Sequence, residues 1–460
     1  MESKATLVNA TRQENELTFN GMATNSTSLN NNVDMFFLAG ATRRWEEKDI
    51  ETLFQKAIVE NPLLALKTLF WARDVRGGAG ERRFFRVCSK FLNKNYRSYL
   101  ETNLTHIPEY GRWDDVFEIE NDEILPLIKE GLEKENGLLA KWLPRKGDFA
   151  NKIRKYLGLT PKDYRKLIVG LSNTVEQAMC AKNWDSIEYP KVPSVAMNKY
   201  RKAFERNDET RFGQFIDDVT DGKAEIKASA IFPYMLYEAC KRGETQKAVE
   251  AQWNALPDYM DGEERVLPVC DVSGSMYGQP MSVSVSLGIY LSERNKGIFK
   301  DAFVTFSNRP TMQYLKGSFY ERVRQLETAH WDMNTNLEAV FELLLTKATK
   351  HNIPKEEMPT KILIISDMEF DSCVRDGSDT AISMIEKRYT EAGYERPEII
   401  FWNVNGRLGN VPGNHNHKGV GLVSGFSPAI MKSVLEGKVD TPTSLMLRAV
   451  LSDRYSPITV

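Results

Sequence analysis

The sequence predicts an α + α/β protein, with an all-helical N-terminal half followed by a doubly wound, mostly parallel sheet. Two observations predict this class. Apolar residues recur at helical spacing through the first half, whereas short apolar runs alternate with amphipathic helices from Val266 onward. The length of 460 residues also exceeds what one hydrophobic core usually organises, so two domains are expected.

The helical half carries helix start signals as well as periodicity. Asn61 and Pro62 supply an N-cap and a first-turn proline, and Thr160 with Pro161 repeats that pair. Helices in succession, without β-rich stretches between them, favour a HEAT-like array of stacked antiparallel pairs, although no fixed repeat period is present. The chain divides into three predicted regions: a flexible N-terminal arm rich in Asn, Ser and Thr over residues 1–33, a helical domain over 34–257 and an α/β domain over 265–460.

Five short apolar runs are expected to form the parallel sheet. The intervals between them are long enough for crossover helices, including one over residues 337–346. Ligands of doubly wound sheets bind at the carboxyl ends of the strands, so residues just past these runs are candidates for a binding site. The predicted strands cover residues 266–270, 302–306, 362–365, 399–404 and 419–423.

Oxygen-bearing side chains follow two of the predicted strands. The first strand leads into the DxSxS sequence of Asp271, Ser273 and Ser275, whose alternate spacing directs one carboxylate and two hydroxyls the same way. Asp367 follows a later strand, and Thr335 precedes a helix between them. Hard cations prefer such oxygens, so we predict a divalent-metal site for Mg²⁺, with Mn²⁺ or Ca²⁺ as alternatives. The competing interpretation is that DxSxS is only a turn sequence.

Two basic blocks lie inside a chain with a net charge of -2, which is typical of a phosphate-binding surface. Residues 141–207 hold 15 Lys or Arg against 6 Asp or Glu, and residues 67–97 hold 9 against 2. The predicted RNA contacts are Lys141, Arg145, Lys146, Lys152, Arg154, Lys155, Arg165, Lys166, Lys199, Arg201 and Lys202. A second group comprises Arg73, Arg76, Arg82, Arg83 and Arg86.

Aromatic residues among these charges could stack on unpaired bases, although such side chains more often pack between helices. The aromatic residues of the longer block are Trp142, Tyr156, Tyr164, Trp184, Tyr189 and Tyr200.

Several other classes are excluded. The five cysteines are far apart and form no CxxC pair, which argues against a zinc site or a disulfide framework. No run approaches the roughly 18 apolar residues of a membrane span, so we expect a cytoplasmic protein. The five histidines are scattered and no nucleophile motif accompanies them, so no enzymatic activity is expected. The glycine-rich stretch 77–80 is interpreted as a helix–helix turn rather than a phosphate-binding nest, and residues 414–417, with two histidines, as a surface loop.

The pattern DxSxS, then Thr, then Asp resembles the metal-ion-dependent adhesion site of the von Willebrand factor A family. Carried over position by position, the resemblance implies the ligands Asp271, Ser273, Ser275, Thr335 and Asp367 on a Rossmann-like sheet. It also implies that a partner's carboxylate fills the last coordination position of the metal.

Further segments resemble signatures of the domain of unknown function 2828 family, which in turn resembles the Ro ribonucleoprotein (TROVE) proteins. That resemblance implies a ring of helical repeats closed by the α/β domain, and binding of small or misfolded non-coding RNA or of single-stranded RNA ends. The segments are KWLPRK at 141–146, LGLTP at 157–161, SDMEFD at 366–371, RPEIIFWN at 396–403 and VSGFS at 423–427.

Three functional hypotheses follow from these patterns. The leading one is a non-enzymatic RNA-binding protein with a metal-bearing α/β domain. The first alternative is a protein-interaction scaffold whose metal captures a partner carboxylate. The second is a metal-assisted nuclease that uses Asp271 and Asp367.

Overall fold

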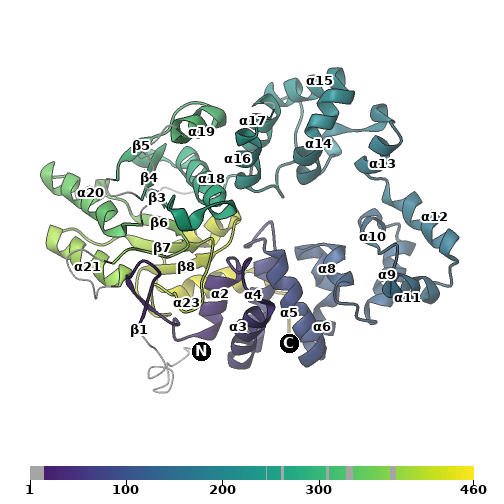
Figure 1. Ribbon diagram of the computed structural model, residues 1–460, viewed down its shortest axis with the longest axis horizontal. Coiled ribbons are helices and arrows are strands. Elements are labelled where there is room, and N and C mark those ends of the chain that lie inside the picture. The colour runs from purple at the N-terminus through teal and green to yellow at the C-terminus, as the bar shows by residue number, and fades with distance from the viewer. Residues whose placement is uncertain (1–14, 245, 261–263, 307–309, 328–334, 373–379) are drawn as a thin grey trace.

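The structure is a computed structural model that describes residues 15–244, 246–260, 264–306, 310–327, 335–372 and 380–460 (Figure 1). The predicted combination of an N-terminal helical half and a C-terminal mixed sheet is confirmed. Within the described residues, no helix combines the length and the apolar character needed to cross a membrane.

The helical half runs from α2 to α17. Its elements are α2 (Asn31–Ala39), α3 (Glu47–Glu60), α4 (Pro62–Arg73), α5 (Arg82–Asn95), α6 (Arg97–Asn103), α7 (Ile107–Tyr110), α8 (Trp113–Phe117), α9 (Ile124–Glu133), α10 (Gly137–Trp142), α11 (Asp148–Tyr156), α12 (Pro161–Ser172), α13 (Val175–Cys180), α14 (Ser194–Asn207), α15 (Glu209–Thr220), α16 (Pro233–Lys241) and α17 (Gln246–Asn254).

At two predicted helix starts, the N-cap side chain makes the expected hydrogen bond to the backbone of the first turn. The Asn61 side chain accepts a hydrogen bond from the Leu64 N–H at 3.1 Å, directly before Pro62 at the first turn of α4. Thr160 accepts one from the Asp163 N–H at 3.2 Å at the start of α12. Each side chain satisfies a backbone donor that the first helical turn leaves without a partner.

The helical half follows an arc that leaves the sheet domain at α2 and returns to it at α16 and α17 (Figure 1). At the first end, the Gly40 N–H donates to the Ser424 hydroxyl at 2.9 Å. At the second end, the rings of Trp253 and Phe319 stack with centroids 3.7 Å apart. Both ends of the helical arc are therefore held by the same domain.

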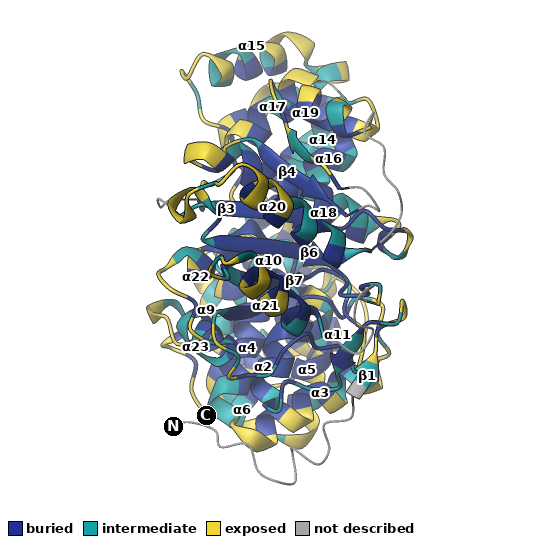
Figure 2. Cartoon of the chain, turned by 90° about the vertical axis from the view of Figure 1, so that its left-hand side faces the viewer, coloured by how far each residue is buried: buried dark blue, intermediate teal, exposed yellow. Residues whose placement is uncertain are grey.

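The sheet has six strands in the order β5-β4-β3-β6-β7-β8, and all neighbours are parallel except β5, which is antiparallel to β4. Figure 2 shows the buried strands between helices whose outer surfaces are exposed. The strands are β3 (Val266–Cys270), β4 (Ala302–Thr305), β5 (Met312–Tyr314), β6 (Lys361–Ser366), β7 (Glu398–Asn403) and β8 (Val420–Ser424). The helices are α18 (Gln279–Arg294), α19 (Phe319–Glu327), α20 (Leu337–Lys350), α21 (Ala381–Ala392), α22 (Met431–Leu435) and α23 (Pro442–Val450).

All five predicted strands are present, with ends shifted by at most one residue. Their side chains are almost entirely buried, and strands buried on both faces have the continuous apolar runs that the sequence displays. The edge strand β5 was not predicted, because its three residues are half-buried or exposed and form no apolar run.

Close packing of α18 on the sheet depends on Gly288. A β-carbon at this position would lie 2.2 Å from the Phe303 ring and 2.4 Å from the Cys270 sulfur. Only glycine lets the helix approach the sheet this closely.

Part of the predicted flexible arm is built into the fold. Residues 15–25 form a hairpin of β1 (Asn15–Leu17) and β2 (Ala23–Asn25), and α2 begins at Asn31. Isolated bridges join the hairpin to Asp371, Thr380 and Val411 of the sheet domain. The prediction of a loose arm is corrected for residues 15–33, because these polar side chains pair with loops more than 300 residues away in sequence. Residues 1–14 lie outside the described residues.

The glycine-rich stretch 77–80 forms a packed junction rather than an exposed nest. Gly80 has φ +74° and lies against the Phe232 ring, where a β-carbon would come within 2.4 Å of that ring. Ala79 packs against Gly425 at the end of β8. The stretch therefore brings α4, α16 and the sheet domain together.

A buried clasp joins the C-terminal segment to the helical half. The Asp74 carboxylate accepts hydrogen bonds from both the Arg454 guanidinium and the Tyr455 hydroxyl, the latter at 3.0 Å. The Tyr110 hydroxyl donates to the Arg454 carbonyl at 2.5 Å, and the Lys67 ammonium donates to the Tyr455 carbonyl. Asp74 is fully buried, so its charge depends on these partners.

Replacing Asp74 with alanine should destabilise the protein by about 3 kcal/mol or more, because Arg454 would be left without its buried partner. Denaturant titration followed by tryptophan fluorescence measures this change. The matched control is Asp217→Ala, which removes an exposed pair with Lys247 and should stay within about 0.5 kcal/mol of the wild type. Equal stability of the two variants would contradict a stabilising role for the clasp.

Candidate functional site

Two carboxylates lie at the same edge of the sheet. Asp271 directly follows β3 and Asp367 directly follows β6, and these strands pair in parallel with Cys270 opposite Ile365. The strand order reverses at this pair, since the chain continues outward to β4 on one side and to β7 on the other. The two side chains therefore occupy the switch point where ligands of doubly wound sheets bind.

The Asp271 carboxylate is fixed on both oxygens. Oδ1 accepts a hydrogen bond from the Ser273 N–H at 2.9 Å, and Oδ2 accepts one from the Ser366 hydroxyl at 2.5 Å. The side chain is fully buried. The DxSxS turn and the end of β6 thus orient one carboxylate toward the switch point.

The Asp367 carboxylate has one unsatisfied oxygen. Oδ1 accepts a hydrogen bond from the Glu369 N–H at 3.2 Å, whereas the buried Oδ2 accepts none from the described residues. Because a buried carboxylate oxygen without a partner is costly, this atom is suited to a cation.

Hydroxyl oxygens complete the set. The Ser273 and Ser275 hydroxyls lie 3.0 Å apart at the start of the 3-10 turn Gly274–Met276. Thr335, just before α20, is buried and donates its hydroxyl hydrogen to Asp371 Oδ1 at 2.6 Å. The structure thus joins Asp271, Ser273 and Ser275 directly, and ties Thr335 to the loop that follows Asp367. Residues 332–334 of the predicted threonine loop lie outside the described residues.

Burial raises the pKa of both carboxyl groups. For Asp271, burial is the largest cause and the nearby Asp367 charge adds to it, while hydrogen bonds from Ser273 and Ser366 oppose the shift. For Asp367, burial is again the largest cause and the charge of Glu369 adds to it, while hydrogen bonds from the Ser275 hydroxyl and the Glu369 N–H and the charge of Arg407 oppose the shift. Simultaneous ionisation of two buried carboxyl groups that repel each other is unfavourable, and a bound cation would remove that penalty.

The donor set fits a hard divalent cation. It consists of carboxylate and hydroxyl oxygens, which Mg²⁺ and Ca²⁺ prefer, and it includes an unsatisfied buried oxygen. Within the described parts of the chain, His, Cys, Asp and Glu form no group of three or more that could hold a metal. Metal binding here would therefore depend on the hydroxyls of Ser273, Ser275 and Thr335.

Sequence patterns did not reveal three residues that support the site. Ser366 hydrogen-bonds Asp271, Asp371 accepts from Thr335, and Asn20 donates to Thr335 Oγ1 at 2.7 Å. Ser366 and Asp371 lie close to Asp367 in sequence, so this proximity could have identified them as supporting residues. Asn20 is 315 residues from Thr335, and no local pattern could have identified it.

Most of the predicted RNA contacts lie on exposed surface. Arg145 and Lys146 occupy the turn between α10 and α11, and Arg165 and Lys166 lie on the exposed side of α12. Within the described residues, no acidic side chain forms an ion pair with any of these four. The other exposed candidates are Lys152, Lys155, Lys199 and Lys202. Of these, Lys152 pairs with Asp122 at 2.5 Å and Lys202 lies 3.9 Å from Glu244.

Arg201 is corrected from a predicted RNA contact to a structural residue. Its side chain is 1% exposed and donates to Glu244, Asn198 and Gln252. Two further candidate RNA contacts already interact within the protein. Lys141 lies 3.6 Å from Glu176, and Arg154 donates to the Leu159 carbonyl at 2.9 Å.

The second basic group is mostly internal. Arg73 is buried against Asp115 at 2.7 Å, and Arg86 binds Asp114, Asp115 and Glu118. Only Arg76 and Arg82 of this group are exposed. Arg73 holds α4 against α8 and Arg86 holds α5 against α8, so these arginines are not available to bind phosphates.

The aromatic residues of the longer block mainly pack between helices, as the alternative interpretation holds. Tyr164 and Tyr189 are buried, and only Tyr156 is an exposed ring. Trp142, Trp184 and Tyr200 pack partly buried against the two hydrophobic cores.

The predicted histidine loop is not a plain surface loop. His415 is buried, its backbone N–H donates to the Ser28 carbonyl at 2.8 Å, and burial lowers the pKa of its imidazole. His417 instead lies 3.9 Å from Glu386. The two imidazoles have different neighbours, which fits packing rather than a shared metal.

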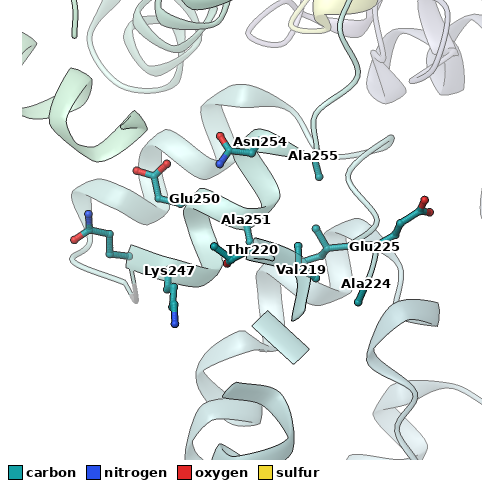
Figure 3. Close-up of a pocket in the computed structure, with 11 residues that line it drawn as sticks. Val219, Thr220, Ala224, Glu225, Lys247, Glu250, Ala251, Asn254 and Ala255 are labelled. Carbon is teal, nitrogen blue, oxygen red and sulfur yellow. The ribbon is translucent and has the colours of Figure 1, made fainter. Parts of the chain in front are cut away.

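A groove of about 730 Å³ lies between α15 and α17, lined by residues such as Val219, Ile226 and Ala251 (Figure 3). Two of its three charged lining residues have partners. Glu250 accepts hydrogen bonds from the Phe319 and Tyr320 N–H groups at the start of α19, and Lys247 pairs with Asp217. The third, Glu225, is exposed and makes no ion pair within the described residues, but a single surface carboxylate does not identify a ligand.

Comparison with protein families assigns both halves of the chain. The model "Domain of unknown function (DUF2828)" matches residues 18–121 and 126–264. The chain belongs to the DUF2828 family. A second model, "Domain of unknown function (DUF7788)", matches residues 265–452. The DUF2828 match thus begins within the β1–β2 hairpin and ends just before β3.

A viral relative spans nearly the whole chain. "Uncharacterized protein L728" of Acanthamoeba polyphaga mimivirus is 28% identical over 505 residues, which covers 96% of this chain and 88% of the relative. The helical half and the sheet domain therefore occur together in this relative too.

Replacing Asp271 with asparagine should stabilise the protein at neutral pH in the presence of a chelator. Since its folded-state pKa is raised, the wild-type carboxyl costs stability as pH rises from about 4 through that raised value. Each tenfold rise in the proton affinity of the buried carboxyl corresponds to about 1.4 kcal/mol, and the amide, which does not ionise, avoids this cost.

Denaturant titration with EDTA at pH 5 and pH 7.5 measures the effect. The wild type should lose stability between these pH values and Asp271→Asn should change less. A variant that is less stable than the wild type at pH 7.5 would show that burial of the charge is not the dominant cost.

Proposed function

We propose that this protein is a non-enzymatic RNA-binding protein of the Ro ribonucleoprotein type, whose sheet domain is a von Willebrand factor A-like domain that binds Mg²⁺. The proposal has two parts, a metal site at the switch point and an RNA surface on the helical arc. The unsatisfied Oδ2 of Asp367 beside the buried Asp271 is the observation that carries the first part.

In the metal site, Asp271, Ser273, Ser275, Thr335 and Asp367 would hold the ion. The cation would neutralise two buried carboxylates whose pKa values burial raises. Support for the A-type assignment comes from the DxSxS turn at the switch point of a sheet with five parallel strands and one antiparallel edge. Mn²⁺ and Ca²⁺ have the same preference for oxygen ligands.

The RNA surface consists of Arg145, Lys146, Lys155, Arg165 and Lys166, here called the α11–α12 basic face. Residues 144–170 hold eight Lys or Arg against two Asp or Glu. These five side chains are exposed and, within the described residues, make no ion pair with an acid. Exposed cations that the protein itself does not neutralise are suited to phosphates.

The alternative of a protein-interaction scaffold is favoured by a separate observation. Phe19 is 80% exposed and Tyr277 is 81% exposed. Phe19 adjoins Asn20, which contacts Thr335, and Tyr277 follows Ser275 by two residues. Exposed rings next to residues of the proposed metal site suit a protein partner that would supply a carboxylate to the metal.

The metal proposal predicts that the full-length protein binds Mn²⁺ at one site and that Asp367→Ala abolishes this binding. Electron paramagnetic resonance of free Mn²⁺ measures it. Glu130→Ala, which removes an exposed carboxylate from α9, is the control and should bind like the wild type. A wild-type protein without a Mn²⁺ site would overturn this part of the proposal.

The RNA proposal predicts that reversing Arg145, Lys146 and Arg165 to glutamate abolishes retention of cellular RNA at moderate salt. In a filter-binding titration, the slope of log K against log salt should fall by about two or more, since three phosphate contacts are lost. The control variant reverses three exposed lysines elsewhere, Lys48, Lys56 and Lys347, and should retain RNA.

Comparing Asp367→Ala with the charge-reversal variant distinguishes the RNA-binding function from the scaffold function. A clean, RNA-free wild type that loses a protein partner on Asp367→Ala would replace the RNA proposal with the scaffold. RNA retention that depends on the α11–α12 basic face and not on Asp367 would support the RNA proposal.

A further inference from the structure

The N-terminal hairpin contributes a side chain to the edge of the metal site. Asn20 Nδ2 donates one hydrogen to Thr335 Oγ1 at 2.7 Å and the other to the Glu369 carbonyl at 2.6 Å. These two acceptors lie on the loops that precede α20 and follow β6. One amide group therefore bridges the two loops that carry Thr335 and Asp367.

The hydrogen bonds of Thr335 leave its oxygen with one lone pair. A hydroxyl oxygen has one hydrogen and two lone pairs. The hydrogen goes to Asp371 Oδ1 at 2.6 Å, and one lone pair accepts from Asn20. Since both of these contacts fix the hydroxyl rotation, the remaining lone pair has a single direction in which it can serve a cation.

The hairpin is attached to the same loop by several other bonds. The Thr18 hydroxyl donates to the Phe370 carbonyl at 2.6 Å, and the Ser372 N–H donates to the Asn20 carbonyl at 3.2 Å. Gly21 and Asp371 form an antiparallel bridge. These bonds hold Asn20 in register with residues 369–372, so its position is determined by backbone pairing rather than by the side chain alone.

We infer that Asn20 is a positioning residue for the divalent cation, and that docking of the β1–β2 hairpin and occupancy of the metal site strengthen each other. The inference rests on the proposed metal site. It assigns a part of that site to a segment that precedes the helical half, although the other metal residues all follow residue 270. Hydrogen-bond partners that orient metal ligands typically change metal affinity by 10- to 100-fold.

The reciprocal effect follows from linkage. If hairpin docking raises cation affinity by a given factor, the cation raises the docking equilibrium by the same factor. Metal binding should therefore slow hydrogen exchange in residues 15–25, which contribute no direct ligand in the proposed site.

The test uses full-length protein and Mn²⁺. Asn20→Ala removes the amide, and Asn20→Leu keeps a branched side chain of similar size without a donor. Asn25→Ala is the matched control, because it removes an amide at the other end of the hairpin that donates to the Val411 carbonyl at 3.0 Å and does not contact Thr335. Thermal unfolding with EDTA checks that each variant folds.

Both Asn20 variants should weaken Mn²⁺ binding about tenfold or more, while Asn25→Ala stays within about twofold of the wild type. Mn²⁺ should slow exchange of the hairpin amides in the wild type and in Asn25→Ala, and much less in the Asn20 variants. Wild-type affinity in Asn20→Ala, or an equal loss in Asn25→Ala, would overturn the role of Asn20. A wild type that binds no Mn²⁺ would overturn the metal site itself and this inference with it.

Discussion

The parallel pairing of β3 with β6 is the constraint on which the candidate site depends. It places two aspartates side by side at a buried edge, where water cannot screen their charges. Hydrogen bonds from the Ser273 and Glu369 backbone N–H groups and from the Ser366 hydroxyl reduce that cost. Even so, Asp367 Oδ2 accepts no hydrogen bond from the described residues, and the proposed cation would supply its missing partner.

The sheet and its metal candidates could be predicted from sequence because their signals are local. A fully buried parallel strand is a continuous apolar run, and the residue after it is fixed at the switch point by strand direction alone. Asp271 and Asp367 are therefore found without knowing any distant contact. The helix starts at Pro62 and Pro161 were predictable for the same reason, since each cap lies one residue away.

Other features could not be predicted because they depend on which distant residues meet. Charge counts treat Arg201 and Arg165 alike, yet one is buried against Glu244 and the other is exposed. The polar composition of residues 15–33 suggested a loose arm, because no neighbouring residue indicates the hydrogen bonds that this segment makes. Thr18 and Asn20 donate to loops of the sheet domain that lie more than 300 residues away in sequence. Composition predicts how many charges and polar groups exist, but not which of them the fold neutralises.

The clasp at Asp74 has a consequence for how the chain reaches this structure during synthesis. Its partners Arg454 and Tyr455 follow 380 and 381 residues later. At ribosomal rates of roughly 5 to 20 residues per second, Asp74 waits about 20 to 75 s before either partner exists. Until then the helical half is without its partner at this junction and exposes a carboxylate that the finished protein buries. The nascent helical half therefore lacks the Asp74 contacts of the folded protein. These contacts form only after Arg454 and Tyr455 have been synthesised.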